Sequence, residues 1–290
     1  MIRSSYEIFS EAARQENFQK AASALNLTRS AVSHSISSLE EQWGFPLFIR
    51  EKNGIRLTEE GKQILPAVRE LLQQEELVQE KAAGLLGRTL GKICLAAFSS
   101  VCSAWMPDLI HKIHLLYPEL EVSLMQGEYE DVCEWVRTGV ADIGLESIPF
   151  ASDLVEIPLA KDEIVCVTPE AFVPENGECV SPEEIGRQHL ILWHSGRNTD
   201  TMRYINRYNI PIGSRYFLKD DSVILTMIAA GEGIGLFPRL ALPKGRTGLR
   251  VWPLKFPAER TIGILLRSRE TLTPSAKKIL QLIKDEYGSL

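Results

Sequence analysis

The stretch from residue 21 to residue 39 reads AASALNLTRSAVSHSISSL. Its apolar side chains recur at helical spacing in two sets, namely Ala21, Ala22 and Leu25, then Val32, Ile36 and Leu39. Between the sets, Asn26 tolerates a left-handed turn and Thr28 is a good N-cap for a second helix. A short helix, a tight turn and a longer helix with an apolar inner side predict a helix-turn-helix unit.

The opposite side of the longer predicted helix is polar. It consists of Arg29, Ser30, Ser33, His34, Ser37 and Ser38. Small hydroxyl side chains let a helix approach a duplex closely, and an arginine near the helix start can reach guanine O6 and N7 with two donors. A serine-rich helix face taken alone is more often merely solvated, but the flanking segments favour contact with DNA.

The segment that follows, residues 43–58, reads WGFPLFIREKNGIRLT. Its Lys-Asn-Gly turn between two short extended runs predicts a β-wing. Arg50, Lys52 and Arg56 give this wing positive charge for a phosphate backbone. Residues 1–65 carry eight Lys/Arg and eight Asp/Glu, so their net charge is zero. Any DNA binding therefore depends on a few local contacts rather than on a broad positive field.

The residue pattern of this N-terminal head matches a known family. The matching positions are Phe18-x-x-Ala21-Ala22-x-x-Leu25, Ser30-Ala31-Val32-Ser33-x-x-Ile36-x-x-Leu39-Glu40, Gly44-x-x-Leu47-Phe48-x-Arg50 and Leu57-Thr58-x-x-Gly61. This pattern resembles the winged helix-turn-helix of LysR-type transcriptional regulators. The resemblance implies a double-stranded DNA operator as partner, contacted by Thr28, Arg29, Ser30, Ser33, His34, Ser37, Arg50, Lys52, Arg56 and Thr58.

The match has three departures. The family often has Gln where Arg29 stands and Arg where His34 stands. It often has a Ser or Thr cap for its second helix, where this chain has Gln19. The first two differences bear on the preferred base sequence rather than on the activity.

Residues 59–88 predict one long helix. Six apolar side chains follow a 4-3 spacing along it, with Glu75 as the polar member of the series: Ile64, Val68, Leu71, Val78, Ala82 and Leu85. About 28 residues make a rod of roughly 42 Å, and so narrow an apolar seam favours a partner helix. The alternative is a helix packed on its own domain. The resemblance implies paired linker helices in homodimers, and we expect a homo-oligomer that is a dimer or a tetramer.

From residue 89 to residue 290, short apolar runs alternate with helical segments, which predicts parallel sheets covered by helices. The order of the runs predicts two α/β lobes, one of residues 89–161 with 267–290 and one of residues 162–266, with crossings near 160–163 and 265–268. This resembles the periplasmic-binding-protein-like effector domain of the same family. The expected fold is therefore α+β and multidomain, with a winged helix-turn-helix at 1–58, a linker helix at 59–88 and a two-lobed effector domain at 89–290.

The expected ligand site is the crevice where the strands of the two lobes end. Ser99 and Ser100 lie at a predicted helix start, whose N–H groups favour an anion, although Ser100 could equally serve only as a cap. By strand-end position and by the resemblance, the first lobe contributes Ser99, Ser100, Val101, Gln126, Gly127, Glu146 and Ser147, and the second contributes His194, Ser195 and Gly196.

These residues predict a small-molecule effector, a carboxylate or an amino acid. Glu128 and Glu146 near the crevice favour a ligand that also carries a donor or a positive group, although glutamates at strand ends are usually solvated.

Enzyme signals are weak. The glycines at 231, 233 and 235 lead from a helix into a strand, the reverse of the dinucleotide-binding order. No Cys or acid motif completes a metal site with His111 and His114, and no G-x-S-x-G motif occurs. We expect no catalytic residue, no metal and no cofactor. The alternative function is a small-molecule-binding protein or enzyme whose helical head serves only for oligomer contacts.

Composition sets the remaining bounds. The chain has 290 residues, 44% of them hydrophobic, and a net charge of −6, so wholesale disorder is excluded and bulk charge gives no argument for nucleic-acid binding. No long apolar run predicts a membrane span or a signal peptide. Five cysteines without a C-x-x-C pair favour a reduced, cytoplasmic chain. Cys166 and Cys179 would form a redox pair only if the fold brought them together.

Overall fold

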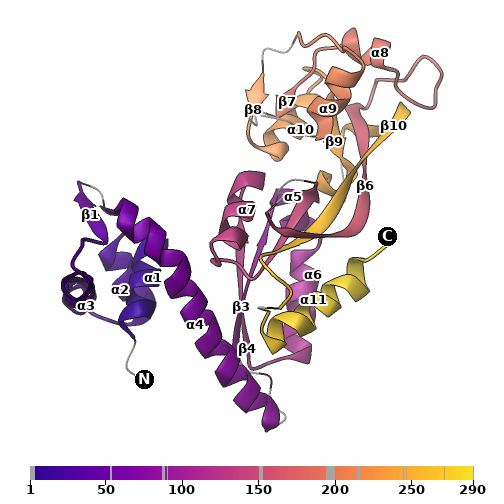
Figure 1. The fold of residues 1–290 in the computed structure, drawn as a ribbon. Coiled ribbons are helices and arrows are strands. Elements are labelled where there is room, and N and C mark those ends of the chain that lie inside the picture. The colour runs from indigo at the N-terminus through magenta and orange to yellow at the C-terminus, as the bar shows by residue number, and fades with distance from the viewer. Residues whose placement is uncertain are drawn as a thin grey trace.

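A computed structural model describes residues 4–52, 54–86, 89, 91–149, 153–193, 200–213, 216–243, 245, 247–270 and 272–289. Figure 1 shows a helical head at the N-terminus, the long helix α4 running away from it, and a body with two lobes. The head consists of α1 (Ser5–Gln15), α2 (Phe18–Leu25), α3 (Arg29–Trp43) and the hairpin of β1 (Phe48–Glu51) with β2 (Gly54–Leu57).

Local sequence signals set the helix boundaries of the head. Asn26 ends α2 in the left-handed conformation at φ 55°, and the Thr28 hydroxyl caps α3 by accepting from the Ala31 N–H at 3.1 Å. Val32, Ile36 and Leu39 are buried, as their spacing predicts. Asn17, rather than Gln19, caps α2, because its side chain accepts from the backbone N–H groups of residues 19 and 20.

Two contacts fix the wing against the helices. The Glu40 carboxylate on α3 accepts from the backbone N–H groups of Leu47, at 2.7 Å, and Phe48, at 3.3 Å. At the other strand, the Ile55 N–H donates to the Glu16 carbonyl at 2.9 Å. A Cβ at Gly54 would lie only 2.5 Å from that carbonyl oxygen, so this position needs glycine. The wing therefore holds a set position beside α3.

The apolar seam of the linker helix α4 (Glu59–Leu85) packs against the head at its start and is exposed further along. Val68 is 5% exposed within the core of the head, and Ile64 packs against that core. The assignment of Val68 to a dimer seam is wrong, because the head already covers this side chain, whereas Ile64 is half-buried and its place in the seam stays a prediction. Further along, Leu71, Val78 and Leu85 are 51%, 62% and 90% exposed, and Ala82 is exposed.

The body is built around one six-stranded sheet in the order β4-β3-β5-β10-β6-β9. Its strands are β3 (Gly91–Ala97), β4 (Leu120–Gln126), β5 (Ile143–Ile148), β6 (Val155–Pro169), β9 (Gly235–Pro238) and β10 (Leu249–Leu266). A second, two-stranded sheet pairs β7 (Leu192–Trp193) with β8 (Phe217–Leu218). Around them lie α5 (Ser99–Ala104), α6 (Met106–Leu116), α7 (Tyr129–Arg137), α8 (Pro182–Gly186), α9 (Asp200–Arg207), α10 (Asp221–Ala229), the 3₁₀ turn η1 (Arg239–Ala241) and α11 (Pro274–Tyr287).

The prediction of parallel sheets holds for only part of the six-stranded sheet. β3 pairs in parallel with β4 and β5, but β10 is antiparallel to both β5 and β6, and β9 is antiparallel to β6. The reason is that β6 and β10 are long strands that pass between the lobes in opposite directions, as Figure 1 shows.

The second crossing between the lobes also lies earlier than expected. Ile262, Ile264 and Leu266 of β10 are buried in the core of the first lobe, whereas Leu254 belongs to the core of the second. The chain therefore returns to the first lobe near Arg260, not at 265–268. No helix in the described part of the chain is long and apolar enough to cross a membrane.

Candidate DNA-binding surface and effector cleft

The outer side of α3 is open to solvent. Arg29, Ser30 and His34 are exposed, and Ser33 and Ser37 are half-buried. Beside them, an Nη of Arg50 on β1 donates to the Ser33 hydroxyl at 3.4 Å. The wing and α3 therefore form one continuous polar surface. Small hydroxyls beside two arginines offer donors and acceptors to base edges and phosphates at close approach.

Other predicted DNA contacts fall in different environments. Lys52 is exposed at the wing, and Arg56 is exposed but forms an ion pair with Glu51 at 3.1 Å. Thr28 is exposed while capping α3. Thr58 is 6% exposed, and its hydroxyl donates to the Pro46 carbonyl at 2.7 Å and accepts from the Gly61 N–H at 2.9 Å. The assignment of Thr58 to DNA contact is therefore withdrawn, because its hydroxyl is buried at the start of α4.

A cleft of about 290 Å³ lies between the lobes and opens into a wider outer groove lined in part by the same residues. From the first lobe it is lined by the start of α5, the end of β4 and the start of α7, and from the second by β7, β9 and the starts of α9 and α10. Of the predicted residues, Ser99, Ser100, Gln126 and Gly127 line it. Helix starts and strand ends thus meet at the cleft, as the topology requires.

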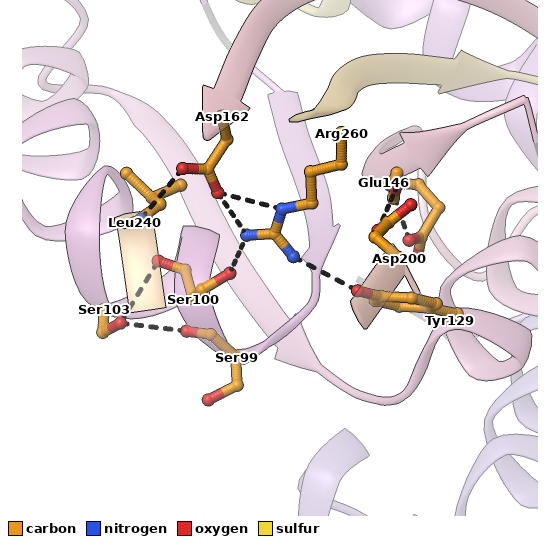
Figure 2. Close-up of polar contacts among 10 residues, drawn as sticks. Ser99, Ser100, Ser103, Tyr129, Glu146, Asp162, Asp200, Leu240 and Arg260 are labelled. Carbon is orange, nitrogen blue, oxygen red and sulfur yellow. Dashed lines mark hydrogen bonds and ion pairs between the residues drawn. The ribbon is translucent and has the colours of Figure 1, made fainter. Parts of the chain in front are cut away.

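Sequence reasoning missed the charged centre of this cleft, which is Arg260 on β10. Its side chain is 2% exposed and donates through Nε to Asp162 Oδ2 at 2.9 Å, with an Nη 2.7 Å from the same oxygen. The guanidinium also donates to the Ser100 hydroxyl at 2.7 Å and to the Tyr129 hydroxyl at 3.2 Å (Figure 2). It lies over the Phe98 ring, 4.8 Å from the ring centroid.

Three of the other predicted effector residues, all within the described part of the chain, do not line the cleft. Val101 is fully buried in the core of the first lobe, because it lies on the inner side of α5, so its assignment to the ligand is wrong. Glu146 and Ser147 are buried behind the lining. Ser100 does line the cleft, but its side chain is buried and its hydroxyl is engaged by Arg260. The predicted residues His194, Ser195 and Gly196 lie outside the described residues.

Burial raises the pKa of several carboxylic acids in this region. It raises the pKa of Glu146 to about 8, and the nearby carboxylates of Asp200 and Glu128 act in the same direction. Burial also raises the pKa values of Glu128 and Asp221, which line the cleft itself. The cleft is thus an acidic environment from which water is partly excluded.

Comparison with known families identifies the chain. The model of the LysR substrate binding domain matches residues 87–288, and that of the bacterial regulatory helix-turn-helix protein of the lysR family matches residues 4–62. The chain belongs to the LysR family. Over 289 residues this LysR-family chain is 27% identical to the HTH-type transcriptional regulator YvbU of Bacillus subtilis, covering 98% of each chain. It is 27% identical to the probable HTH-type transcriptional regulator LrrA of Synechococcus elongatus, covering 92% of this chain and 91% of LrrA.

Solved structures share the fold of this LysR-family chain. A full-length OxyR variant from Pseudomonas aeruginosa matches with a TM-score of 0.76 at 19% identity, covering 98% of this chain and 94% of that one. CbnR in complex with its target DNA matches with a TM-score of 0.65 at 16% identity, covering 97% and 98%.

Membership of this family establishes what kind of protein the chain is. The LysR-family chain is a DNA-binding transcriptional regulator with an effector-binding domain, and it is not an enzyme. The alternative of a solute binder or enzyme with a purely oligomeric head is therefore set aside.

The cysteines of this LysR-family chain are free thiols, Cys166 and Cys179 included. Burial raises the pKa of Cys102 to about 11 and that of Cys133 to about 12, so these two thiols stay protonated and unreactive at neutral pH. No group of three or more metal-binding side chains gathers anywhere in the described residues.

Proposed function

We propose that this regulator reads its operator with the outer side of α3 and holds the phosphate backbone with the wing. The observation that carries this proposal is the continuous exposed polar surface from Arg29 to Arg50, joined through Ser33. Arg29, Ser30, Ser33, His34 and Ser37 would face the bases. Arg50, Lys52 and Arg56 would face phosphates, with Arg56 exchanging Glu51 for a phosphate oxygen.

We further propose that the regulator works as a homodimer whose α4 helices pair through Leu71, Val78, Ala82 and Leu85, and that dimers can join into tetramers. The exposure of these apolar side chains supports this pairing, since large apolar patches on a soluble chain mark interfaces. A dimer places two recognition helices in successive major grooves, about 34 Å apart. Regulation of transcription in this way places the protein in the cytoplasm, where the chromosome lies.

The effector binds, in this proposal, in the cleft between a first lobe of residues 89–161 with the C-terminal segment and a second lobe that ends near Arg260. A ligand that binds the closed cleft more tightly than the open one shifts the population of the two forms. The first lobe is joined to α4 by the Arg69 donor to the Thr138 carbonyl at 3.0 Å and by Glu80, which accepts from the Ser275 N–H at 2.8 Å. A change in the lobes would thereby reach the paired linker helices.

Of the two predicted effector classes, the amino acid fits the described lining better than a simple carboxylate. An amino acid supplies an ammonium group to the acids of the cleft, whereas a carboxylate supplies only negative charge.

Binding-site selection from random duplexes, followed by gel-shift titration of the selected site, tests the DNA surface. The double variant Arg29→Ala/Ser33→Ala should lose affinity by about 1–3 kcal/mol per base contact and relax the base preference. Lys277→Ala, which removes an exposed cation on α11, is the matched control and should bind as the parent does. Unchanged affinity and preference in the double variant would refute the assignment of α3.

A further inference from the structure

The inner cleft is lined by carboxylic acids from both lobes. Glu128 and Asp131 stand at the start of α7 in the first lobe, and Asp200 and Asp221 stand at the starts of α9 and α10 in the second. The only cation among the described lining residues of this inner cleft is Arg260. Lys219 lines the wider outer groove, beside Asp220 and Asp221.

The charge of Arg260 is already neutralised inside the protein. Asp162 lies directly opposite it in the register of β10 with β6, and their side chains form a buried ion pair at 2.7 Å. The guanidinium makes two contacts as donor to Asp162, one to the Ser100 hydroxyl and one to the Tyr129 hydroxyl. Among the described residues of the cleft, a ligand therefore meets an excess of carboxylates rather than an unpaired cation.

A second observation is an unpartnered polar atom just behind the acidic lining. Glu146 is fully buried; one of its oxygens accepts from the Ser147 N–H, and the Ser147 hydroxyl donates to Asp200 Oδ2 at 3.0 Å. The other oxygen, Oε2, has no hydrogen-bond partner among the described residues. Figure 2 shows Glu146 and Asp200 together, on the side of the guanidinium where Tyr129 lies. A buried oxygen left without a partner is costly. Because burial raises the pKa of Glu146 to about 8, this carboxyl is largely protonated at neutral pH, so behind the lining it is an unsatisfied polar group rather than a negative charge.

The described acids of the cleft differ in the hydrogen bonds and ion pairs that their carboxyl groups make. Asp131 Oδ2 accepts from the Glu128 N–H at 2.9 Å, and Asp200 has both Ser147 and an ion pair with Arg203 at 2.6 Å. The described part of the chain gives the carboxyl of Asp221 neither a hydrogen bond nor an ion pair. Asp221 is thus the acid most free to pair with a ligand.

Aromatic rings form the apolar part of the same cleft. Phe98 comes from the first lobe, and Trp193 and Phe237 come from the second. The electron-rich faces of such rings attract ammonium and guanidinium groups as well as apolar bodies, and the Phe98 ring already has the Arg260 guanidinium over it. With a volume of about 290 Å³, the cleft suits a compact organic molecule rather than a peptide or a polymer.

We propose that the effector is an organic cation, with a primary ammonium or guanidinium group on a compact apolar body. The cationic group pairs with Asp221 and Asp200 and the body stacks among the aromatic rings. This inference rests on the proposed function, in which the cleft is the effector site. Because the acids belong to opposite lobes, their mutual repulsion opposes closure of the empty cleft, and a cation between them removes that repulsion. The charge of the effector would thereby favour the closed form.

A charge-matched ligand series on the full-length protein tests this proposal. The probes are phenethylamine, phenylalanine, phenethyl alcohol and hydrocinnamate, which share a phenyl body and differ in charge. We expect phenethylamine to bind most tightly by titration calorimetry, at least about tenfold more tightly than hydrocinnamate, and to give the largest rise in melting temperature. Asp221→Asn should weaken phenethylamine about tenfold and leave phenethyl alcohol unchanged. Glu178→Gln, which neutralises an exposed acid elsewhere on the second lobe, should change neither.

Any other order overturns the proposal. It fails if hydrocinnamate, phenylalanine or phenethyl alcohol binds as tightly as phenethylamine, if no cation binds, or if Asp221→Asn retains the affinity for phenethylamine. Failure of the DNA proposal is a separate result, because it would appear in the gel-shift titration of the Arg29→Ala/Ser33→Ala variant, without any effector. A tightly bound anion that depends on Arg260 would refute the cation while leaving the cleft as the effector site.

Discussion

Breaking the buried ion pair between Arg260 and Asp162 should destabilise the body more than any surface substitution on the same strands. The two side chains are 2% and 7% exposed, so neither charge can turn to water when its partner is removed. In Asp162→Asn the guanidinium loses its carboxylate and keeps, among the described residues, only uncharged hydrogen-bond acceptors: the new amide oxygen and the Ser100 and Tyr129 hydroxyls. The arginine cannot neutralise itself by losing a proton, because a guanidinium stays charged in proteins. Removal of one partner of a buried pair typically costs about 3–5 kcal/mol.

The reciprocal change should cost less. In Arg260→Met, Asp162 keeps its acceptor contact with the Leu240 N–H at 3.0 Å and can take up a proton, which the guanidinium cannot lose. The double variant Asp162→Asn/Arg260→Met removes both charges, so its loss should be clearly smaller than the sum of the two single losses. The order of destabilisation is thus a direct consequence of which charge is left behind.

Urea unfolding of the full-length protein, followed by tryptophan fluorescence, measures these differences. The matched control is the ion pair between Lys161 and Glu259 on the same two strands, whose side chains are 53% and 50% exposed. Glu259→Gln should cost no more than about 1 kcal/mol, as exposed pairs do. The reasoning is refuted if Asp162→Asn costs no more than Glu259→Gln, or if the two single losses at the buried pair simply add.

Three further predictions concern other parts of the chain. Burial raises the pKa of Glu146 from 4.5 to about 8, which lowers the free energy of unfolding by an amount that is zero below pH 4.5 and largest above pH 8. Glu146→Gln should therefore be more stable than the parent over that range, by up to about 3 kcal/mol at pH 7. A gain in stability that does not depend on pH would contradict this. Glu40→Ala should destabilise the head by about 1–3 kcal/mol, since two buried N–H groups lose a charged acceptor, whereas the exposed neighbour Glu41→Ala should have little effect in the same thermal unfolding assay. Leu85→Asp should shift sedimentation velocity profiles toward monomer, because Leu85 is 90% exposed in the chain, while an unchanged dimer would remove the proposed seam.

The head was predictable in detail because its signals are local. Asn26 and Thr28 carry the turn and the cap within a few residues of each other, and the apolar period of α3 leaves its polar side to solvent. Such features depend on backbone conformation and helix geometry, which short sequence windows record. The family resemblance then gave the class of the whole chain.

Features that depend on partners distant in sequence were not predictable. The spacing that includes Val68 and Leu71 identifies an apolar side of α4, but it cannot tell which part the head covers. Arg260 pairs with Asp162 across 98 positions of sequence, so nothing near either residue indicates the pair. The same limit explains why the assignment of Val101 to the ligand is wrong. A helix start predicts that its first turn is exposed to a ligand, but the packing of α5 turns this side chain inward.

The pairing of Arg260 also decides which charge the cleft prefers, and this gives a last test. If Asp162 is what prevents Arg260 from attracting anions, then Asp162→Asn should free a positive charge at the wall of the cleft. Well below its melting temperature, this variant should bind phenethylamine more weakly and hydrocinnamate more tightly than the parent, each by about tenfold for a change of 1.4 kcal/mol. Glu259→Gln, which leaves the guanidinium paired, should keep the preference of the parent. An Asp162→Asn protein that folds and retains that preference would mean that the acids of the cleft, and not the neutralised arginine, determine ligand charge by themselves.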